Sequence, residues 1–285
     1  MAAILTFNPD LQRLRENITA ISPQVGKVLI VDNHSCNIEG VLRVANEFAN
    51  SFVIRNDENV GVARALNQEA QYAVGHGYEW LLHLDQDTVV ADTLIETYIQ
   101  YVDDPSLGII CCQVKDRNVV EPPELTRNQL MEANVSTCIT SGTFLRLAAW
   151  QKTAGYCDEM FIDWVDNDFC YSLQEVGYKI FKTRKTFILH EVGNSRLVKS
   201  FGKYRYVYNE KPFRHYYSIR NYIYVQKRHW AFLSQNRTSY FLTCLYVLLK
   251  KIFFVNVHET DRVAKNHMMV KGIWHGIVNR YGKLA

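Results

Sequence analysis

Residues 80–90 read WLLHLDQDTVV, an apolar run that is interrupted by two aspartates, Asp85 and Asp87, and then resumes. A buried strand that ends on two like charges is unfavourable unless a cation or hydrogen-bond donors neutralise them. A divalent metal supplies such a charge, and Mg²⁺ and Mn²⁺ both accept oxygen ligands. The Asp-x-Asp tripeptide alone occurs by chance in many proteins, so it is the preceding strand that makes a metal site the favoured hypothesis.

Strand-like segments alternate with amphipathic helical patterns on both sides of this run. The predicted strands are residues 3–6, 27–31, 51–55, 80–84 and 108–113, and the predicted helices are residues 11–21, 38–48, 61–74 and 91–101. Later in the chain we expect a surface loop over 115–134 and a further strand over 135–140. This alternation is typical of βαβ units and predicts an α/β fold with a mainly parallel sheet flanked by helices. In such sheets ligands bind beyond the carboxyl ends of the strands.

The predicted strand ends are polar at the same edge of the sheet. Four strands run into the segments TFNP (6–9), DNHS (32–35), NDEN (56–59) and DQD (85–87). Taken singly, each group is also explained by turns and helix caps, which favour Asn, Asp and Ser. Together, at corresponding positions, they indicate one shared ligand site.

Charge divides the 285-residue chain into two unlike regions, although its net charge is only +3. Residues 1–195 hold 15 Lys and Arg against 26 Asp and Glu, whereas residues 196–285 hold 17 against 3, which gives −11 and +14. The acidic region suits bound cations, and the basic one suits an anionic partner. We therefore expect two regions, one over 1–195 with a site that holds cations and a basic, aromatic, helical one over 196–285.

Several motifs occur in a characteristic order along residues 1–230. They are TFNP, VDNHS, NVGVARALNQ, LHLDQDT, SGTFLR, FIDWVDNDFC, LHEVGN and YYSIRNYIYV. As an ordered set they resemble the family 2 inverting glycosyltransferases of GT-A fold, and most closely the bacterial rhamnosyltransferases of O-antigen and related surface polysaccharides. The resemblance implies a Rossmann-like domain that moves L-rhamnose from dTDP-β-L-rhamnose to a lipid-linked oligosaccharide acceptor.

The same resemblance implies roles for individual residues. Asp87, Asp85 and His190 would bind Mg²⁺ or Mn²⁺, unless His190 is a structural histidine. The implied nucleotide-sugar pocket consists of Thr6, Phe7, Asn8, Asp32, Asn59, Gly61, Arg64, Asp85, Gln86 and Arg220. In it, Asp32 would read the pyrimidine edge, and Arg220 would close over the diphosphate as a bidentate donor. Simple surface helix positions are the alternative for both arginines.

An inverting transfer also needs a carboxylate that takes the proton of the attacking hydroxyl group. Asp163, Asp166 and Asp168 are the candidates in FIDWVDNDFC. Alignment on the following Phe-Cys-Tyr places Asp166 at the position of the base, but Val165 stands where relatives commonly have Glu, so Asp163 stays open. Asp168 is equally well explained as a carboxylate in the first turn of a helix.

The basic C-terminal region predicts a partner and a location. Its aromatic residues are interleaved with Lys and Arg, and residues 240–254 are strongly apolar, which favours docking on anionic lipid. Packing in a homo-oligomer interface is the alternative, whereas no nucleic-acid-binding motif is present. The apolar run 240–249 stops at Lys250 and Lys251, short of the roughly 20 residues that span a bilayer. With no basic leader at the N-terminus, we expect a cytoplasmic protein, peripheral at the inner face of the membrane.

Other functions stay open from the sequence alone. The donor could be a UDP-hexose instead of a dTDP-sugar, and the chain could be a non-catalytic glycan-assembly subunit, although that role needs no Asp85, Asp87 or Asp166. A glycoside hydrolase also uses paired carboxylates, but it needs no nucleotide rim. A nicotinamide enzyme is disfavoured because no GxGxxG follows the first predicted strand.

Overall fold

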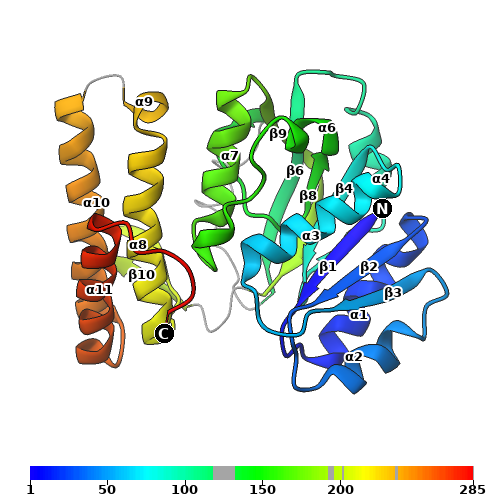
Figure 1. Ribbon diagram of the computed structural model, residues 1–285, viewed down its shortest axis with the longest axis horizontal. Helices are drawn as coiled ribbons and strands as arrows, with labels where there is room; N and C mark the ends of the chain where they lie inside the picture. The colour runs from blue at the N-terminus through cyan, green and yellow to red at the C-terminus, as the bar shows by residue number, and fades with distance from the viewer. Residues whose placement is uncertain (118–131, 192–195, 201, 235–236, 285) are drawn as a thin grey trace.

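A curled sheet flanked by helices forms the first two thirds of the chain, as seen in a computed structural model that describes residues 1–117, 132–191, 196–200, 202–234 and 237–284 (Figure 1). Its strands are β1 (Ala2–Thr6), β2 (Val28–Asp32), β3 (Ser51–Arg55), β4 (Trp80–Asp85), β5 (Val89–Val90), β6 (Leu107–Asp116), β7 (Ala133–Val135), β8 (Thr143–Arg146) and β9 (Lys179–His190). They are ordered β3-β2-β1-β4-β8-β6-β9-β5, and β7 pairs with β9. The predicted α/β fold is confirmed.

The four N-terminal strands are parallel, and their register places the polar strand ends together. Thr6 lies opposite Asp32, Asp32 lies opposite Arg55, and Leu5 lies opposite Asp85. The predicted rim is therefore real: the ends of β1, β2, β3 and β4 are neighbours. Beyond β4 the sheet is mixed, because β8 runs antiparallel to both β4 and β6.

Helices cover both faces of the sheet and bury separate clusters of apolar side chains against it. One face carries α1 (Leu11–Ile21), α2 (Ile38–Ala45) and α4 (Leu94–Ile99), and the other carries α3 (Val62–Gly75), α6 (Leu147–Gln151) and α7 (Val165–Glu175). The central strands are buried on both faces and read as short continuous apolar runs, while the helices show a 3.6-residue apolar period. This explains why the observed boundaries agree with the predicted ones to within a few residues.

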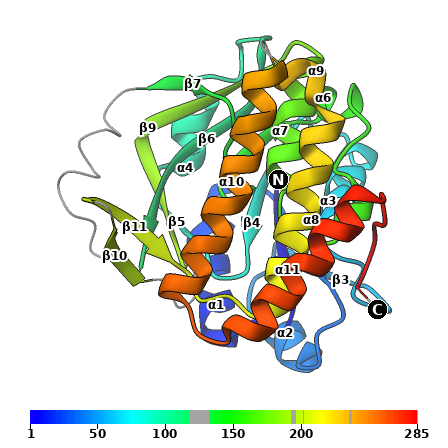
Figure 2. The same cartoon turned by 90° about the vertical axis from the view of Figure 1, so that its left-hand side faces the viewer.

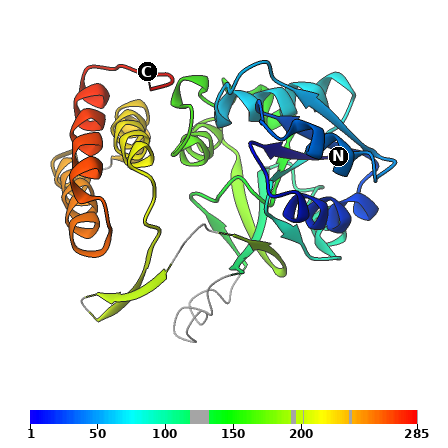
Figure 3. The same cartoon turned by 90° about the horizontal axis from the view of Figure 1, so that it is seen from below.

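A second helical layer follows in sequence and stands beyond α7 (Figure 3). It contains α8 (Pro212–Arg228), the short α9 (Trp230–Leu233), α10 (Arg237–His258) and α11 (Arg262–Ile277). The last three long helices lie side by side (Figure 2) around a small core of Ile219, Val255 and Met269. Buried Asp168 of α7 connects this layer to the part of the chain that contains the sheet. It accepts hydrogen bonds from Arg228 Nη1 at 3.1 Å and from His229 Nε2 at 3.0 Å.

The structure corrects three local predictions. Of the strand expected at 135–140, only Val135 lies in one, as the last residue of β7, and residues 136–140 have no strand pairing. The C-terminal region is not wholly helical, since β10 (Arg196–Ser200) and β11 (Lys203–Val207) form an antiparallel hairpin. The surface loop expected at 115–134 falls mostly on residues 118–131, which lie outside the described ranges.

The apolar run near the C-terminus is also longer than predicted. Helix α10 continues through Lys250 and Lys251, so that Ser239–His258 forms a 20-residue segment of mean hydropathy 1.6, of which 6% is buried. By length and composition alone this helix could cross a membrane, and the prediction that the run is too short is wrong.

Candidate active site

Two aspartates and a histidine meet at the carboxyl end of β4. His190 Nδ1 lies 3.3 Å from Asp87 Oδ1, and His190 Nε2 lies 3.9 Å from Asp85 Oδ2. Each of the three residues offers one ligand atom, and these three atoms all lie within 4.8 Å of one another. The short antiparallel pairing of Val89 with Leu189 brings these segments together across about a hundred residues of sequence.

Neighbouring hydroxyl and amide groups hold this cluster in place. Thr88 Oγ1 lies 3.0 Å from His190 Nδ1 and 2.7 Å from Ser141 Oγ, and the Ser141 hydroxyl accepts the backbone N–H of Asp85 at 2.9 Å. Asn17 donates to the carbonyl oxygen of Asp85 at 2.7 Å. Such outer partners fix the orientation of groups that bind a metal.

The cluster fits a divalent cation. Two carboxylates and an imidazole are a donor set that Mg²⁺ and especially Mn²⁺ accept. Oδ1 of Asp87 is buried and faces His190 at 3.3 Å, but no donor in the described structure makes a well-aligned hydrogen bond to it, so it can bind a metal ion. Burial raises the pKa of Asp85, and the charge of Asp87 adds to that. For His190 burial lowers the pKa, but the adjacent Asp87 and Asp85 carboxylates outweigh it, so that the pKa of this imidazole is raised.

The end of β1 is bound to the end of β2 by side chains. Thr6 Oγ1 donates to Asp32 Oδ1 at 3.0 Å, and Asp32 Oδ2 accepts the backbone N–H of Ser35 at 2.9 Å. Thr6 and Asp32 have no exposed surface, so Asp32 shapes the pocket from beneath. Each of its two oxygen atoms already accepts one protein donor, and the direct reading of a base edge by Asp32 stays a prediction.

Phe7 and its neighbours are the open part of this rim. Phe7 is 46% exposed, so its aromatic ring is accessible to a ligand. Its backbone N–H donates to Gln86 Oε1 at 2.8 Å, and Asn8 Oδ1 accepts the N–H of Cys36 at 2.8 Å. Gln86 thus links the Asp-x-Asp turn to the loop that presents Phe7.

The far side of the rim is built by Asn59 and Gly61. Asn59 Oδ1 accepts from Asn33 Nδ2 at 3.1 Å and from the Gly61 N–H at 3.0 Å. Gly61 has a φ of 86°, and a Cβ there would lie 2.8 Å from the carbonyl oxygen of Phe161, so this position requires glycine. Arg64 follows in the first turn of α3 and is exposed.

Of the three candidate bases, Asp166 has the most suitable surroundings. Asp168 is fully buried in its contacts with Arg228 and His229, which gives it a structural role. Asp163 binds Arg214 Nη2 at 2.6 Å. Asp166 accepts the backbone N–H of Asn167 at 2.9 Å. Burial, with the charges of Asp163 and Asp85, raises the pKa of Asp166 to about 6, close to the value wanted of a general base.

Arg220 is fully buried, and its expected contact with the diphosphate stays a prediction. Its N–H groups donate to Asn221 Oδ1 and to the carbonyl oxygens of Gly282, Glu159 and Met160. Asn221 Nδ2 in turn donates to the carbonyl oxygens of Met160, Ile162 and Asp163. The Arg-Asn pair therefore holds the loop that presents the acidic residues.

That loop is conformationally strained. Phe161, Asp163 and Trp164 have φ values of 63°, 67° and 65°, in the left-handed region that side chains other than glycine disfavour. Such backbone persists where surrounding contacts over-determine it, and it is concentrated at functional sites. The donors of Arg220 and Asn221 supply those contacts.

Arg214, Thr88 and Ser141 are site residues that sequence reasoning missed. Ser141 lies in the motif SGTFLR, which could have pointed to it, and Thr88 directly follows the Asp-x-Asp tripeptide. For Arg214 there was no local signal, since it is one of many basic residues in the C-terminal region.

Comparison with known proteins gives a family match and a curated relative. The sequence model of the family described as "Glycosyl transferase family 2" matches residues 2–162. A "dTDP-rhamnosyl transferase RfbF" of Shigella flexneri is 26% identical over 277 residues, covering 92% of this chain and 88% of that protein.

Solved structures share the fold. The chain superposes on S. aureus TarS 1-349 with a TM-score of 0.61 at 12% identity, covering 98% of this chain and 81% of that one. TarS 1-349 in complex with UDP-GlcNAc gives a TM-score of 0.61 at 13% identity, with coverage of 97% and 80%. GalNAc-T7 with UDP, GalNAc and Mn2+ gives 0.58 at 12% identity, covering 98% of this chain and 56% of that one.

Proposed function

This chain belongs to glycosyl transferase family 2, and from that premise we propose that it transfers L-rhamnose from dTDP-β-L-rhamnose, with inversion, to a hydroxyl group of a lipid-linked glycan in bacterial surface polysaccharide synthesis. The observation that carries the proposal is the juxtaposition of the Asp85, Asp87 and His190 cluster with Asp166 beside the nucleotide rim. Similarity to a protein named as a dTDP-rhamnosyl transferase supports the donor.

Binding of the donor follows from the rim. Phe7 offers an aromatic face on which a pyrimidine base can stack, a contact worth roughly 1–3 kcal/mol per base. Thr6, Asp32 and Asn8 hold the loops on one side of the pocket, and Asn59 and Gly61 hold those on the other. Arg64 is placed to contribute positive charge at the open edge.

Asp85, Asp87 and His190 would hold Mg²⁺ or Mn²⁺, and the bound ion would stabilise the charge that develops on the departing diphosphate. The chain itself supplies the base. As the acceptor oxygen attacks the anomeric carbon, Asp166 takes the hydroxyl proton while the bond from that carbon to the diphosphate oxygen breaks. Attack from the face opposite the diphosphate inverts the anomeric centre.

A donor panel tests this function. The purified full-length protein is offered dTDP-β-L-rhamnose, UDP-glucose, UDP-galactose and UDP-N-acetylglucosamine, each with Mg²⁺ or Mn²⁺ and a synthetic lipid-diphosphate oligosaccharide. We expect nucleotide release and a product mass increased by one deoxyhexose only with dTDP-rhamnose. Transfer from a UDP-sugar alone would reassign the donor, and a protein that binds these nucleotides without any transfer would be an assembly subunit.

We further propose that the C-terminal layer docks on an anionic membrane, where a lipid-linked acceptor would lie. The outward side of α10 exposes Phe241, Leu245 and Leu249 to 61%, 43% and 57%. These positions are four residues apart and lie on one face of the helix. The surrounding region carries the +14 charge, including exposed Lys250 and Arg262, which complements anionic lipid.

The buried side of α10 favours a helix that lies on the membrane over one that spans it. Lys251 turns inward, and its ammonium group donates to Ser218 Oγ of α8. Insertion of the whole helix into the bilayer would require this buried cation to leave its partner and enter hydrocarbon, which is costly. An amphipathic attachment keeps Lys251 in the protein and buries only the outward face.

Vesicle binding tests the docking surface. We expect the triple variant Phe241→Ser, Leu245→Ser, Leu249→Ser to bind phosphatidylglycerol-containing vesicles at least about a hundredfold more weakly in co-sedimentation, since each apolar side chain contributes roughly 1.5–3 kcal/mol. Ile99→Ser, at an exposed apolar position on α4, is the matched control and should bind as the parent does. If the parent ignores vesicles and the triple variant instead converts a dimer to a monomer in ultracentrifugation, the surface is an oligomer interface.

A further inference from the structure

Arg214 lies in the first turn of α8 and contacts the loop of residues 159–164, called the acidic loop from here on. Its Nη2 lies 2.6 Å from Asp163 Oδ1 and 3.4 Å from Glu210 Oε1. The pair is incompletely satisfied, because Nε of Arg214 and Oδ2 of Asp163 are both buried without a hydrogen-bond partner among the described residues. Buried donors and acceptors of charged groups are costly to leave unpaired, so this arrangement has room for another ligand.

The loop that Arg214 contacts lies directly against the predicted nucleotide rim. The backbone N–H of Val62, next to Gly61 of the rim, donates to the carbonyl oxygen of Phe161 at 2.5 Å. Asp163, the partner of Arg214, follows two residues later. A donor diphosphate held at the rim would therefore be a neighbour of Arg214.

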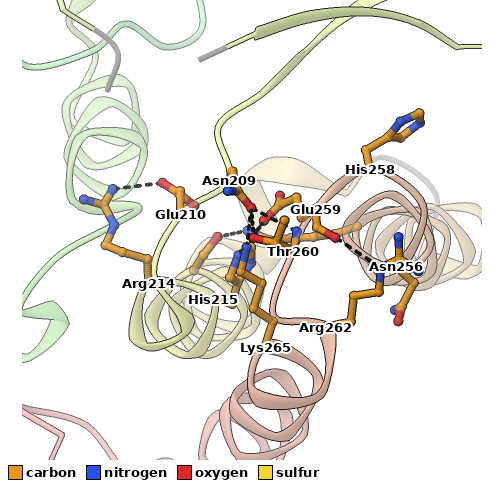
Figure 4. A network of polar contacts seen from close by, with 12 residues as sticks. Asn209, Glu210, Arg214, His215, Asn256, His258, Glu259, Thr260, Arg262 and Lys265 are labelled. Atoms are coloured by element: carbon orange, nitrogen blue, oxygen red, sulfur yellow. Dashed lines mark hydrogen bonds and ion pairs between the residues drawn. The ribbon is translucent and has the colours of Figure 1, made fainter. Parts of the chain in front are cut away.

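A buried ionic network fixes the helix start that carries Arg214 (Figure 4). Lys265 is 1% exposed, and its Nζ donates to Glu259 Oε2 at 2.7 Å and to Asn209 Oδ1 at 2.8 Å. His215 Nε2 lies 3.1 Å from the same Glu259 oxygen. Since Asn209 and His215 flank Arg214 in sequence, the network holds the backbone on both sides of it, and breaking such a network leaves a buried charge unpaired.

The other cations of α8 and α10 near the loop are already committed. The N–H groups of Arg220 donate to Asn221 and to three carbonyl oxygens, and Lys251 donates to Ser218. The Arg214 side chain is 34% exposed, so it is reachable from solvent while its backbone is fixed. Arginine also binds phosphate with two parallel N–H groups, which lysine cannot do.

We propose that Arg214 binds the β-phosphate of the nucleotide-sugar donor, exchanging its contact with Asp163 for phosphate oxygens. This inference rests on the proposed function and adds a residue to it. When the acceptor oxygen bonds to the anomeric carbon, the bond from that carbon to the β-phosphate oxygen breaks and its electron pair stays on that oxygen. The acceptor proton passes to Asp166, and the guanidinium stabilises the new charge on the leaving diphosphate.

Nucleotide titration of the full-length protein tests this role. With Mn²⁺ present, we expect Arg214→Ala to raise the Kd for dTDP about tenfold to a hundredfold by calorimetry, and to leave the Kd for dTMP unchanged, since dTMP has no β-phosphate. Arg214→Lys should lie between. Lys211→Ala removes the same charge from an exposed position three residues earlier and should leave both constants unchanged.

Asp163→Asn separates this role from a purely structural one. If Arg214 binds phosphate, the Asn variant releases the guanidinium and should bind dTDP at least as tightly as the parent. If Arg214 serves only to anchor Asp163, then Asp163→Asn and Arg214→Ala lose dTDP affinity together, and the inference is overturned. Equal dTDP affinity of Arg214→Ala and parent also overturns it. A parent protein that binds neither dTDP nor UDP removes the proposed function itself, which is a different outcome.

Should Arg214→Ala melt far below the parent, Arg214→Lys and Asp163→Asn decide the matter on their own. The first keeps the ion pair and loses bidentate geometry, and the second keeps the shape of the loop. Weaker dTDP binding by Arg214→Lys, together with undiminished dTDP binding by Asp163→Asn, supports the inference, and any other pattern contradicts it.

Discussion

Transfer by the Asp166→Asn variant is expected to be slower by about a thousandfold, the middle of the range for a lost general base, while its affinity for nucleotide is unchanged. Asp166 lies in the first turn of α7, directly after the strained loop, and unlike Asp163 and Asp168 it has no ion pair with Arg214 or Arg228. An amide of the same shape cannot take a proton. Steady-state transfer rates and nucleotide titration of the same preparations measure the two quantities.

The pH dependence gives an independent signature of this residue. The base must be ionised, and burial with nearby Asp163 and Asp85 raises its pKa to about 6, so parent activity should rise with pH through that value. Stability changes with pH in the opposite direction to activity. Because folding raises the pKa of Asp166, the folded protein loses stability as the pH rises from the ordinary value of 3.8 to about 6. Asp166→Asn should therefore be more stable than the parent at pH 8, by about 1–3 kcal/mol.

Two other variants complete this test. Asp158→Asn removes an exposed carboxylate from the segment before the loop and should retain parent activity. Asp163→Asn distinguishes the second candidate base. If Asp163→Asn were inactive and Asp166→Asn kept near-normal turnover, the proton would have to go to Asp163, and our assignment would be wrong.

Loss of metal binding is the second large effect that we expect. Changing Asp87 to Asn should lower kcat/KM by at least about a hundredfold, because even residues that only orient metal ligands cost about 10–100-fold. The Asp87 carboxylate faces His190 at 3.3 Å and has a buried oxygen atom open to a ligand. Mn²⁺ titration followed by electron paramagnetic resonance should show a weaker Kd, and a chelator should abolish parent activity until Mg²⁺ or Mn²⁺ is restored.

Asp92→Asn is the control for this experiment. It removes an exposed carboxylate five residues further along the chain and should leave both metal affinity and activity as in the parent. A parent enzyme that works equally well in chelator, together with an active Asp87→Asn variant, would show that the cluster is only an ion-paired group and that transfer needs no metal.

Local sequence patterns were sufficient for the scaffold. The alternation of strands and helices, and the polar segments after β1, β2, β3 and β4, predicted both the fold and the rim. Burial on both faces gives the strands short continuous apolar runs, and burial of one face gives the helices a period of 3.6, and both patterns can be read within a few residues of sequence. The carboxyl ends of parallel strands then share one edge by geometry alone, so Asp85 and Asp87 could be placed at a site before any contact was known.

What the tertiary structure decided is which charges meet. His190 contacts Asp87 across 103 positions in the numbering. Arg214 binds the Asp163 carboxylate, whereas Arg220 binds only backbone carbonyl oxygens of the same loop. Asp168 is paired with His229 of the helical layer. Ion pairs depend on distances in space that carry no local period, and a basic region of +14 offers many equivalent partners in sequence. The sequence by itself therefore determined the sheet, its rim and the Asp-x-Asp pair, and only the folded chain selected the histidine, the base and the arginine that stand beside them.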